Sequence, residues 1–321
     1  MASSNMKCFQ LNTGAFMPAV GLGCFMGPTQ IGESEHVTAM VKLALDLGYR
    51  HFDTVNSTCN ESSVGDALRG TTVPRSELFL TTKLDQKDHG RVREALHASL
   101  TKLGVDYVDL YLMHWPMAYD ESGTSSHSGK TLQPDEKPTF VETWKDLEAS
   151  LAEGTAKAIG VSNFSVKTLT ELLNHTDIVP AVNQVELHPS LPQNELLAFC
   201  RERGILLTAY SPVGKFKFAD DPEITAIADA HHASSAQLLL SWGVQRGTAV
   251  IPKTVHATRM RENLQLFNLT QADMEALDAF HKKPGMHRSV CGFHSAELGG
   301  SCWGWTYEQL GWQMTVGGVH L

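Results

Sequence analysis

The chain has 321 residues, and its 26 Lys and Arg against 35 Asp and Glu give a formal net charge of −9 at pH 7. Its 42% hydrophobic and 19% charged residues are typical of a globular protein and exclude a disordered chain. The negative charge disfavours nucleic acid and anionic membrane as partners, and no apolar run reaches the ~18 residues that span a bilayer. Six scattered cysteines without a CxxC pair, and no secretory signal, predict a cytoplasmic protein with reduced thiols and no metal site.

A short hairpin is predicted first, because Cys8–Leu11 and Ala15–Val20 flank the turn residues Asn12-Thr13-Gly14. After it, segments typical of strands and helices alternate. The predicted strands are Tyr49–Asp53, Leu78–Lys83, Val108–His114, Ala156–Ser162, Ala181–Glu186, Ile205–Tyr210 and Ala249–Lys253. The predicted helices are Ser34–Leu47, Asn60–Arg69, Arg91–Leu103, Phe140–Glu153, Val166–Asn174, Asn194–Arg203 and Ser234–Trp242.

This alternation predicts an α/β fold with a parallel sheet, and the short stretch Ala19–Leu22 supplies an eighth strand. Eight strand–helix units over roughly 250 residues fit a closed (β/α)8 TIM barrel. A doubly wound open sheet is the alternative, but the GxGxxG turn that such folds usually carry begins at Gly21-Leu22-Gly23 and fails at Met26. We therefore expect one barrel domain over residues 1–321, with an N-terminal hairpin, long substrate loops and a C-terminal tail.

Polar residues end several predicted strands, and this matters because chemistry in a barrel lies where strands end and loops begin. Asp53, Lys83 and His114 are 30 and 31 residues apart, about one strand–helix unit each, so we expect them at equal height on adjacent strands. A single such residue is more often structural than catalytic. Burying three ionisable groups together requires mutual pairing, so Lys83 is expected close to Asp53.

Five segments, in this order, resemble the aldo-keto reductase family. They are Gly48–Thr54, Leu112–Pro116, Ala158–Phe164, Tyr210–Pro212 and Ile251–Thr254. The resemblance covers about Gly21 to Asn263 and implies an eight-stranded α/β barrel that binds NADP(H) without a Rossmann domain. It also implies an oxidoreductase that acts on a small molecule, with a monomer as the default state.

The resemblance assigns cofactor contacts residue by residue. Ser162, Asn163 and Gln184 are expected to bind the nicotinamide amide, and Tyr210 to stack on its ring. Lys253, Thr254 and Arg259 are expected to bind the 2′-phosphate of the adenosine ribose, and Glu262 and Asn263 are expected near the adenine. The remaining residues expected near the cofactor are Gly23, Cys24, Asp53 and Ser211.

The family's catalytic tyrosine is missing. The family implies Asp, Tyr, Lys and His, with the tyrosine five residues after the aspartate, and Asn60 and Glu61 fix that register without a gap. Thr58 occupies the position. An aliphatic hydroxyl is far less acidic and shorter than a phenol, and loss of a positioned general acid typically costs ~10²–10⁴-fold in rate.

Other groups could supply the proton. His114, directly or through a water in the vacated space, is the first candidate, and Asp53, Thr58, Lys83 and His114 form the predicted catalytic set. Lys83 itself, or a phenol swinging in from Tyr119 or Tyr307, are alternatives. Cys59 is adjacent in sequence, but its side chain is expected to point elsewhere.

The substrate loops are predicted at 117–138, 215–222 and the tail 281–321. The tail is rich in aromatic residues, so it could close over a bulky apolar substrate or simply pack on the barrel. The predicted pocket residues are Phe25, Trp115, Tyr119, Trp303 and Trp305.

Three functions therefore stay open. The first is an NADPH-dependent reductase with a nonstandard proton donor, which the cofactor segments favour. The second is a non-redox acid/base enzyme, an isomerase or dehydratase, on the same scaffold. The third is a pseudoenzyme that binds NADP(H) and signals cofactor state to a partner; the missing phenol favours these last two.

Overall fold

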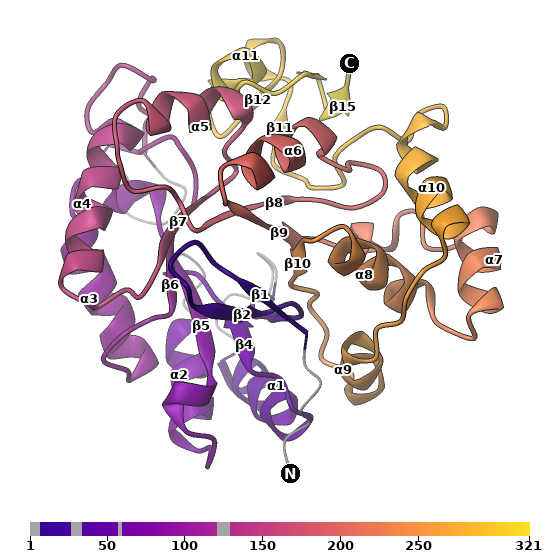
Figure 1. The fold of residues 1–321 in the computed structure, drawn as a ribbon. Helices are drawn as coiled ribbons and strands as arrows, with labels where there is room; N and C mark the ends of the chain where they lie inside the picture. Colours follow the sequence, from indigo (N-terminus) through magenta and orange to yellow (C-terminus); the bar gives the residue numbers. More distant parts are fainter. Residues whose placement is uncertain (1–6, 27–33, 57–59, 121–128) are drawn as a thin grey trace.

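The computed structural model describes residues 7–26, 34–56, 60–120 and 129–321. Within them, eight parallel strands form one sheet in the order β10-β9-β8-β7-β6-β5-β4-β3. Their bounds are β3 Leu22–Gly23, β4 His51–Asp53, β5 Phe79–Leu84, β6 Leu110–Met113, β7 Ile159–Ser162, β8 Val182–Glu186, β9 Leu206–Tyr210 and β10 Ala249–Val250. Figure 1 shows these strands in the centre of the molecule with the helices around them.

The sheet closes on itself beside its two edge strands. A parallel bridge joins Val20 to Val250, where Gly21 N donates to the Val250 carbonyl at 2.9 Å and Val250 N donates to that of Ala19 at 2.8 Å. The predicted (β/α)8 barrel is confirmed. Closure removes the two exposed edges that an open sheet would leave.

Most of the predicted strands begin one to three residues later in the structure than expected, and the two edge strands show the shifts that bear on closure. The last strand ends at Val250 rather than Lys253, because Pro252 has no N–H with which to continue the ladder. The first strand of the barrel is Leu22–Gly23, slightly later than the predicted Ala19–Leu22, whose first residues instead form the closing bridge.

Seven helices follow the predicted pattern closely: α1 Ser34–Asp46, α2 Glu61–Arg69, α3 Val92–Leu103, α4 Phe140–Ala152, α5 Val166–Leu173, α6 Asn194–Glu202 and α8 Ser235–Gln245. Three further helices before the C-terminal tail were not predicted: α7 Pro222–Ala230, α9 Ala257–Leu264 and α10 Gln271–Ala279. Two of these carry readable start signals, since α7 has Asp221 as N-cap with Pro222 at its first position and α10 has a capping box from Thr270 to Asp273.

Side chains alternate between the inside and the outside of the barrel. Leu110 and Leu112 of β6 pack inside, where the residues Leu11 and Met17 around the N-terminal hairpin (β1 Cys8–Gln10, β2 Phe16–Pro18) also lie. Gly160 makes room there, because a Cβ at this position would come within 2.8 Å of the Leu112 side chain. The hairpin therefore fills the lower end of the barrel and leaves the strand ends as the open mouth.

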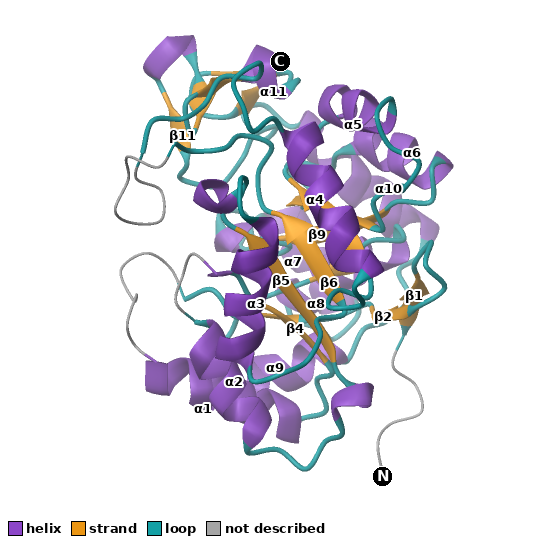
Figure 2. Ribbon diagram, turned by 90° about the vertical axis from the view of Figure 1, so that its left-hand side faces the viewer, coloured by secondary structure: helices purple, strands orange, loops and turns teal. Residues whose placement is uncertain are grey.

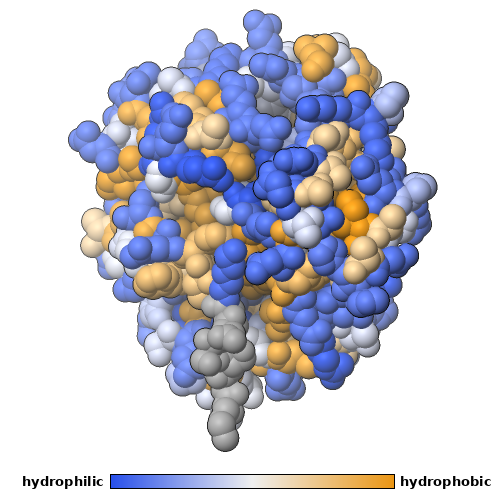
Figure 3. Space-filling model, turned by 45° about the vertical axis from the view of Figure 1, so that its right-hand side comes forward, coloured by the Kyte–Doolittle hydropathy of each residue, from blue (hydrophilic) through white to orange (hydrophobic). Residues whose placement is uncertain are grey.

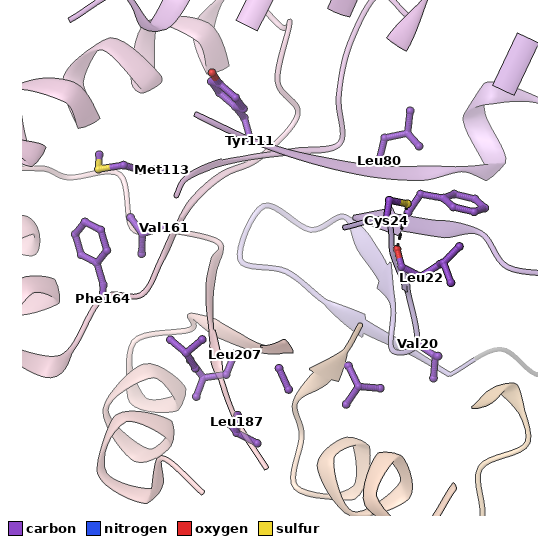
Figure 4. Packing of buried hydrophobic residues seen from close by; sticks show 14 of the residues in the cluster. Val20, Leu22, Cys24, Leu80, Tyr111, Met113, Val161, Phe164, Leu187 and Leu207 are labelled. Carbon is purple, nitrogen blue, oxygen red and sulfur yellow. Dashed lines mark hydrogen bonds between the residues drawn. The ribbon is translucent and has the colours of Figure 1, made fainter. Parts of the chain in front are cut away.

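The opposite faces of the strands form the larger core, against the helices. Figure 4 shows part of it, with Cys24, Leu80, Tyr111, Val161 and other buried side chains around the strands. On the outer surface, hydrophilic and hydrophobic residues are interspersed across the face shown in Figure 3. Among the described residues, no helix has the length and apolar character needed to cross a membrane.

The C-terminal tail is built from short elements: β11 His294–Ser295, β12 Ser301–Cys302, β13 Trp305–Thr306, α11 Tyr307–Leu310, β14 Met314–Thr315 and β15 Val319–His320. They gather at one end of the molecule, at the upper left of Figure 2, and beside α5 and α6 in Figure 1. Lys167 of α5 donates to the Glu308 carbonyl at 2.8 Å, which ties the tail to this helix.

Candidate functional site

A buried ion pair lies at the mouth of the barrel. Asp53 ends β4, and Lys83 on the neighbouring β5 points to the same inner side, because Asp53 is in register with Thr81 and side chains alternate. Lys83 Nζ lies 2.5 Å from Asp53 Oδ1 and also donates to the Thr54 carbonyl at 3.0 Å. Their side chains are only 4% and 7% exposed. The expected pairing of Lys83 with Asp53 is confirmed.

Asp53 is also held by residues from distant parts of the chain. Gln184 Nε2, from β8 across the barrel, donates to Asp53 Oδ2 at 2.7 Å. Cys24 N donates to the Asp53 carbonyl at 2.8 Å, and Asn60 Nδ2 donates to the carbonyl of Cys24 at 2.9 Å. With both carboxylate oxygens and the backbone engaged, the orientation of Asp53 is fixed.

Cys24 contributes its backbone rather than its thiol. The side chain lies in the outer core, with Sγ 3.6 Å from the Leu22 carbonyl (Figure 4). Burial and the nearby Asp53 charge raise the pKa of this thiol, so it stays protonated.

His114 follows β6, the strand next to Lys83, and is half-buried. Its backbone N donates to the Leu84 carbonyl at 3.2 Å, and its carbonyl accepts from Asn163 Nδ2 at 2.9 Å. Asn163 has a positive φ of 65° and also accepts a 2.8 Å hydrogen bond from Tyr210 Oη. Asn163 therefore links the ends of β6, β7 and β9.

The other residues predicted to hold the nicotinamide lie close by. Ser162 Oγ donates to the Gln184 carbonyl at 2.8 Å. Tyr210 is half-buried at the end of β9, and burial raises the pKa of its phenol, which keeps it a hydrogen-bond donor. Ser211, next in the chain, has a φ of 49° and its Oγ lies 3.8 Å from Cys291 Sγ.

The predicted phosphate and adenine contacts follow β10. Lys253 and Arg259 are exposed, and the Arg259 guanidinium lies 5.8 Å from the centre of the Phe216 ring. Thr254 is buried, with its hydroxyl accepting from His256 N at 3.2 Å. On α9, Glu262 is half-buried and Asn263 is buried.

Thr58 and Cys59 lie outside the described residues. The two alternative phenols have partners of their own. Gln86 Nε2 donates to Tyr119 Oη at 3.2 Å, and Tyr307 Oη lies 2.8 Å from His294 Nδ1 and accepts from Gly318 N at 3.1 Å. Each would have to give up these bonds to act as the proton donor.

An aromatic cluster lies beside His114. The Trp115 ring is 5.1 Å from that of Phe293, 6.4 Å from that of Trp303 and 6.0 Å from that of Trp312. Tail residues therefore reach the loop that follows β6. Part of the loop 117–138, residues 121–128, lies outside the described residues.

Two other predicted pocket residues, Trp305 and Phe25, differ from each other in exposure. Trp305 is 2% exposed, and its indole N–H donates to the Leu132 carbonyl at 2.7 Å, so it packs the tail against the loop. Phe25 is 48% exposed. Trp305 thus follows the packing interpretation that the sequence left open.

Comparison with known proteins gives the family. Residues 19–282 match the Aldo/keto reductase family. The chain belongs to this family. The match spans the barrel from the closing bridge to the end of α10, whereas most of the tail lies beyond it.

Individual aldo/keto reductases are similar over most of the chain. The NADP(+)-dependent glycerol 2-dehydrogenase of Saccharomyces cerevisiae is 40% identical over 88% of this chain and 94% of its own length. Aldo-keto reductase family 1 member A1 of Rattus norvegicus is 41% identical over 85% of this chain and 88% of its own. An aldo-keto reductase of Bombyx mori, solved in complex with NADP, is 34% identical with a TM-score of 0.80, and covers 90% of this chain and 96% of its own.

Sequence reasoning missed two inward-facing residues of this aldo/keto reductase. Glu186 ends β8, two residues after Gln184, and accepts from His188 Nε2 at 2.9 Å, Ser289 Oγ at 2.6 Å and Val290 N at 2.7 Å. Burial alone would raise its pKa, but these hydrogen bonds hold the pKa below its ordinary value. The sequence feature that could have indicated Glu186 is an acidic residue in a buried strand, two positions after Gln184 and therefore on the same face.

His51 is the second, one layer below Asp53. Its Nδ1 lies 3.2 Å from the Pro18 carbonyl and so carries the proton, while Nε2 accepts from Thr81 Oγ1 at 3.3 Å. Burial lowers the pKa of His51 to about 4, so the imidazole is neutral. Gly21 makes this position possible, since a Cβ there would come within 2.6 Å of the ring.

Proposed function

We propose that this chain is an NADP(H)-dependent oxidoreductase of the aldo-keto reductase type that acts on a carbonyl, or conjugated carbonyl, of a small and bulky apolar metabolite. Membership of the family supports the cofactor and the reaction class. The observation that carries the proposal is the buried Lys83–Asp53 pair, which Gln184 joins from across the barrel. Its proton donor is a group other than the family's tyrosine, because Thr58 stands in that position.

The donors and acceptors at the mouth fit a nicotinamide amide. Ser162, Asn163 and Gln184 offer a hydroxyl and two amides, and the Tyr210 ring offers a flat surface. Gln184 and Tyr210 now donate to Asp53 and Asn163, so we expect these bonds to be exchanged on binding. When bound, NADPH supplies the hydride.

The residues predicted to bind the 2′-phosphate have the charge and hydrogen-bond donors that a phosphate dianion requires. Lys253 and Arg259 are exposed cations close in sequence to the hydroxyl of Thr254, a set that favours a 2′-phosphate over a free ribose hydroxyl. At the end of the neighbouring strand β3, Gly23 lets the backbone lie close to Ile251, because a Cβ at this position would come within 3.0 Å of the Ile251 carbonyl oxygen. We infer that these residues orient the cofactor across the mouth.

The chain's own residues must then deliver a proton. Lys83 has three N–H donors, of which Asp53 and Thr54 take two among the described residues, so its charge can stabilise the developing alkoxide. His114 stands on the next strand and is half-buried, so we propose that it donates, directly or through one water. Tyr119 and Tyr307 are weaker candidates because their phenols are already hydrogen bonded.

The substrate class rests on the aromatic cluster. Phe293 and Trp303, both half-buried, offer apolar surface around the buried Trp115 that follows His114, and this suits a bulky apolar substrate. We further propose one domain that acts as a monomer in the cytoplasm, on a small molecule and not on nucleic acid. The net charge of −9 and the six cysteines scattered along the sequence without a CxxC pair support this.

Restoring the phenol tests the proposal. Thr58→Tyr is expected to raise kcat/KM for simple aldehydes by ~10²–10⁴-fold, because it returns the general acid that the family carries at this position. The assay follows the loss of reduced-nicotinamide absorbance with a panel of aldehydes and ketones. Thr101→Tyr, at an exposed position of α3, is the matched control and should change nothing.

Two other outcomes point elsewhere. If NADPH binds, by fluorescence titration, but neither the wild type nor Thr58→Tyr turns over any carbonyl, then Asp53, Lys83 and His114 do not form a reductase site. A pseudoenzyme or a non-redox isomerase or dehydratase, which the missing phenol favours, then takes its place. If NADPH does not bind, both the reductase and the NADP(H)-binding pseudoenzyme are wrong.

A further inference from the structure

A cavity of about 520 Å³ lies beneath the C-terminal tail. One wall is formed by the starts of α5 and α6 and the end of β8, and the other by tail residues that include Trp312 and Met314. We call it the tail cavity. Its volume falls within the range of pockets that hold small organic molecules. Among the described residues that line it, Asp53, Lys83 and His114 are absent, whereas Asn163 and Tyr210 are present, so the tail cavity adjoins the barrel mouth without including the ion pair.

The tail cavity meets the mouth at a partition. Tyr210 and Asn163, joined by their hydrogen bond, lie on its inner side. Trp312 lines it from the tail, and the same indole lies 6.0 Å from the ring of Trp115 in the aromatic cluster. The two spaces therefore share walls but present different chemistry.

The walls are rich in rings and apolar side chains. Trp312 and Met314 of the tail face Leu191, Leu196 and Val166 of the barrel side. Aromatic surfaces opposite aliphatic ones suit a flat ring system, because they bury its two faces without requiring polar atoms there.

Four histidines complete the lining: His281, His287, His294 and His320. The rings of His287 and His320 stack at 3.8 Å, and that of His281 meets His287 edge-on at 4.8 Å. Burial together with the neighbouring imidazoles lowers the pKa of His287 to about 4, and burial also lowers the pKa of His281 and His294. The rings of His281, His287 and His294 are therefore uncharged at neutral pH. Among the described residues no such group is arranged to hold a metal ion.

The fixed charges give no preference for an ionic ligand. Glu186 is saturated by its three donors, and Glu195 is exposed at the rim. Lys167 is exposed, and its ammonium, which donates to the Glu308 carbonyl, lies in solvent at the rim of the cavity. Because the buried part of the cavity therefore offers a ligand no unsatisfied charge of either sign, a neutral ligand is favoured there.

We propose that the tail cavity is a second binding site, for a neutral, planar aromatic compound. The compound would lie between the tail and the starts of α5 and α6, on the far side of Tyr210 and Asn163 from the Lys83–Asp53 pair. This inference goes beyond the proposed function and does not depend on it.

Two probes of nearly the same shape test the charge preference. N-phenyl-1-naphthylamine is neutral, whereas 1-anilinonaphthalene-8-sulfonate carries one negative charge on the same skeleton. Titration of the full chain, followed by probe emission, should show saturable binding of one neutral molecule, with the sulfonate at least about tenfold weaker, or about 1.4 kcal/mol. Equal affinity for both probes, or no saturable binding of the neutral one, would overturn the proposal.

Filling the cavity tests the location. Met314→Trp from the tail and Val166→Trp from α5 each place bulk in the space from opposite walls, and each should weaken the neutral probe at least about tenfold. Val316→Trp is the matched control, because Val316 is exposed and lies two residues from Met314 outside the lining. Thermal unfolding shows whether each variant is folded. If both filled variants fold and bind the probe as the wild type does, the tail cavity is not the site.

NADPH titration of the same samples separates the two proposals. Loss of probe binding in the filled variants with NADPH affinity unchanged supports the second site. A wild type that binds the probe in this filling-sensitive way but not NADPH would refute the proposed function alone. A wild type that binds NADPH but not the probe would refute the second site alone.

Discussion

The barrel mouth and the C-terminal tail hold their polar groups by different means. At the mouth, Asp53 and Lys83 project from neighbouring strands whose ladder sets their height and direction. In the tail, each paired strand has only two residues, and attachment depends on side chains such as Glu186, which binds Ser289 and Val290. At the mouth, many backbone hydrogen bonds between strands hold the side chains in place, whereas in the tail a few side-chain hydrogen bonds hold the segment on the barrel. We therefore expect single substitutions to act on catalysis and global stability at the mouth, and on local order in the tail.

The largest effect is expected at the buried ion pair. Lys83→Met leaves the Asp53 carboxylate buried without its cation, which should lower the free energy of unfolding by ~3–5 kcal/mol and remove activity. Urea unfolding measures the loss. Adding Asp53→Asn should restore part of it, since no uncompensated charge then remains.

The exposed pair Lys137–Glu142 is the matched control, and Lys137→Met should cost less than ~1 kcal/mol because solvent screens it. A loss for Lys83→Met as small as that of the control would mean that the mouth is open to water and that the ladder does not bury the pair.

The next effect is a pH dependence inside the barrel. The unfolded chain protonates His51 near its ordinary pKa of 6.5, but the folded protein does so only near 4. The contribution of neutral His51 to the free energy of unfolding is therefore fully present above pH 6.5. It decreases as the pH falls toward 4, by ~3 kcal/mol in total. Urea midpoints at pH 7, 6 and 5 measure the slope.

His51→Gln should flatten this pH dependence, whereas His97→Gln, at an exposed position of α3, should leave it unchanged. If the urea midpoint of His51→Gln depends on pH as steeply as that of the wild type, the acid sensitivity comes from other histidines, such as His287. The pH dependence would then belong to the tail and not to the barrel.

The smallest effect is expected where the tail is attached. Glu186→Gln removes the charge that accepts from His188, Ser289 and Val290, and should cost ~1.5–3 kcal/mol. Because the attachment is local, limited proteolysis of the tail should accelerate while NADPH affinity changes little. Glu297→Gln, exposed in the same tail, should stay within ~0.5 kcal/mol of the wild type. If Glu186→Gln unfolds the whole barrel instead, the two regions are one cooperative unit.

Much of the fold was predictable because its pattern is local. Buried strands alternating with helices that stop at glycine, as at Gly104, appear directly in the residue order. The helices α7, α9 and α10 were not predicted, because the residues after Tyr210 and Lys253 were interpreted only as a substrate loop and as individual cofactor-binding residues. The register of Asp53 and Lys83 was predictable from their spacing, since equivalent strand–helix units bring equivalent residues to the same height.

Contacts between distant segments were not predictable. Nothing in the residue order indicates that Gln184 reaches Asp53, that the Cys24 thiol points away from the mouth, or that Trp305 packs on the carbonyl of Leu132. Each of these contacts and orientations depends on the distance between two elements that only the closed barrel brings together.

The sequence by itself determined the barrel and the family, because residue type, period and spacing follow the order of the chain, and its register with the family predicts that Thr58 stands in the position of the tyrosine. Only the tertiary structure decided which side chains meet across the barrel and how the tail encloses a cavity against α5 and α6. The physical reason is range: backbone geometry repeats over a few residues, whereas packing between segments more than a hundred residues apart depends on the shapes of both surfaces together.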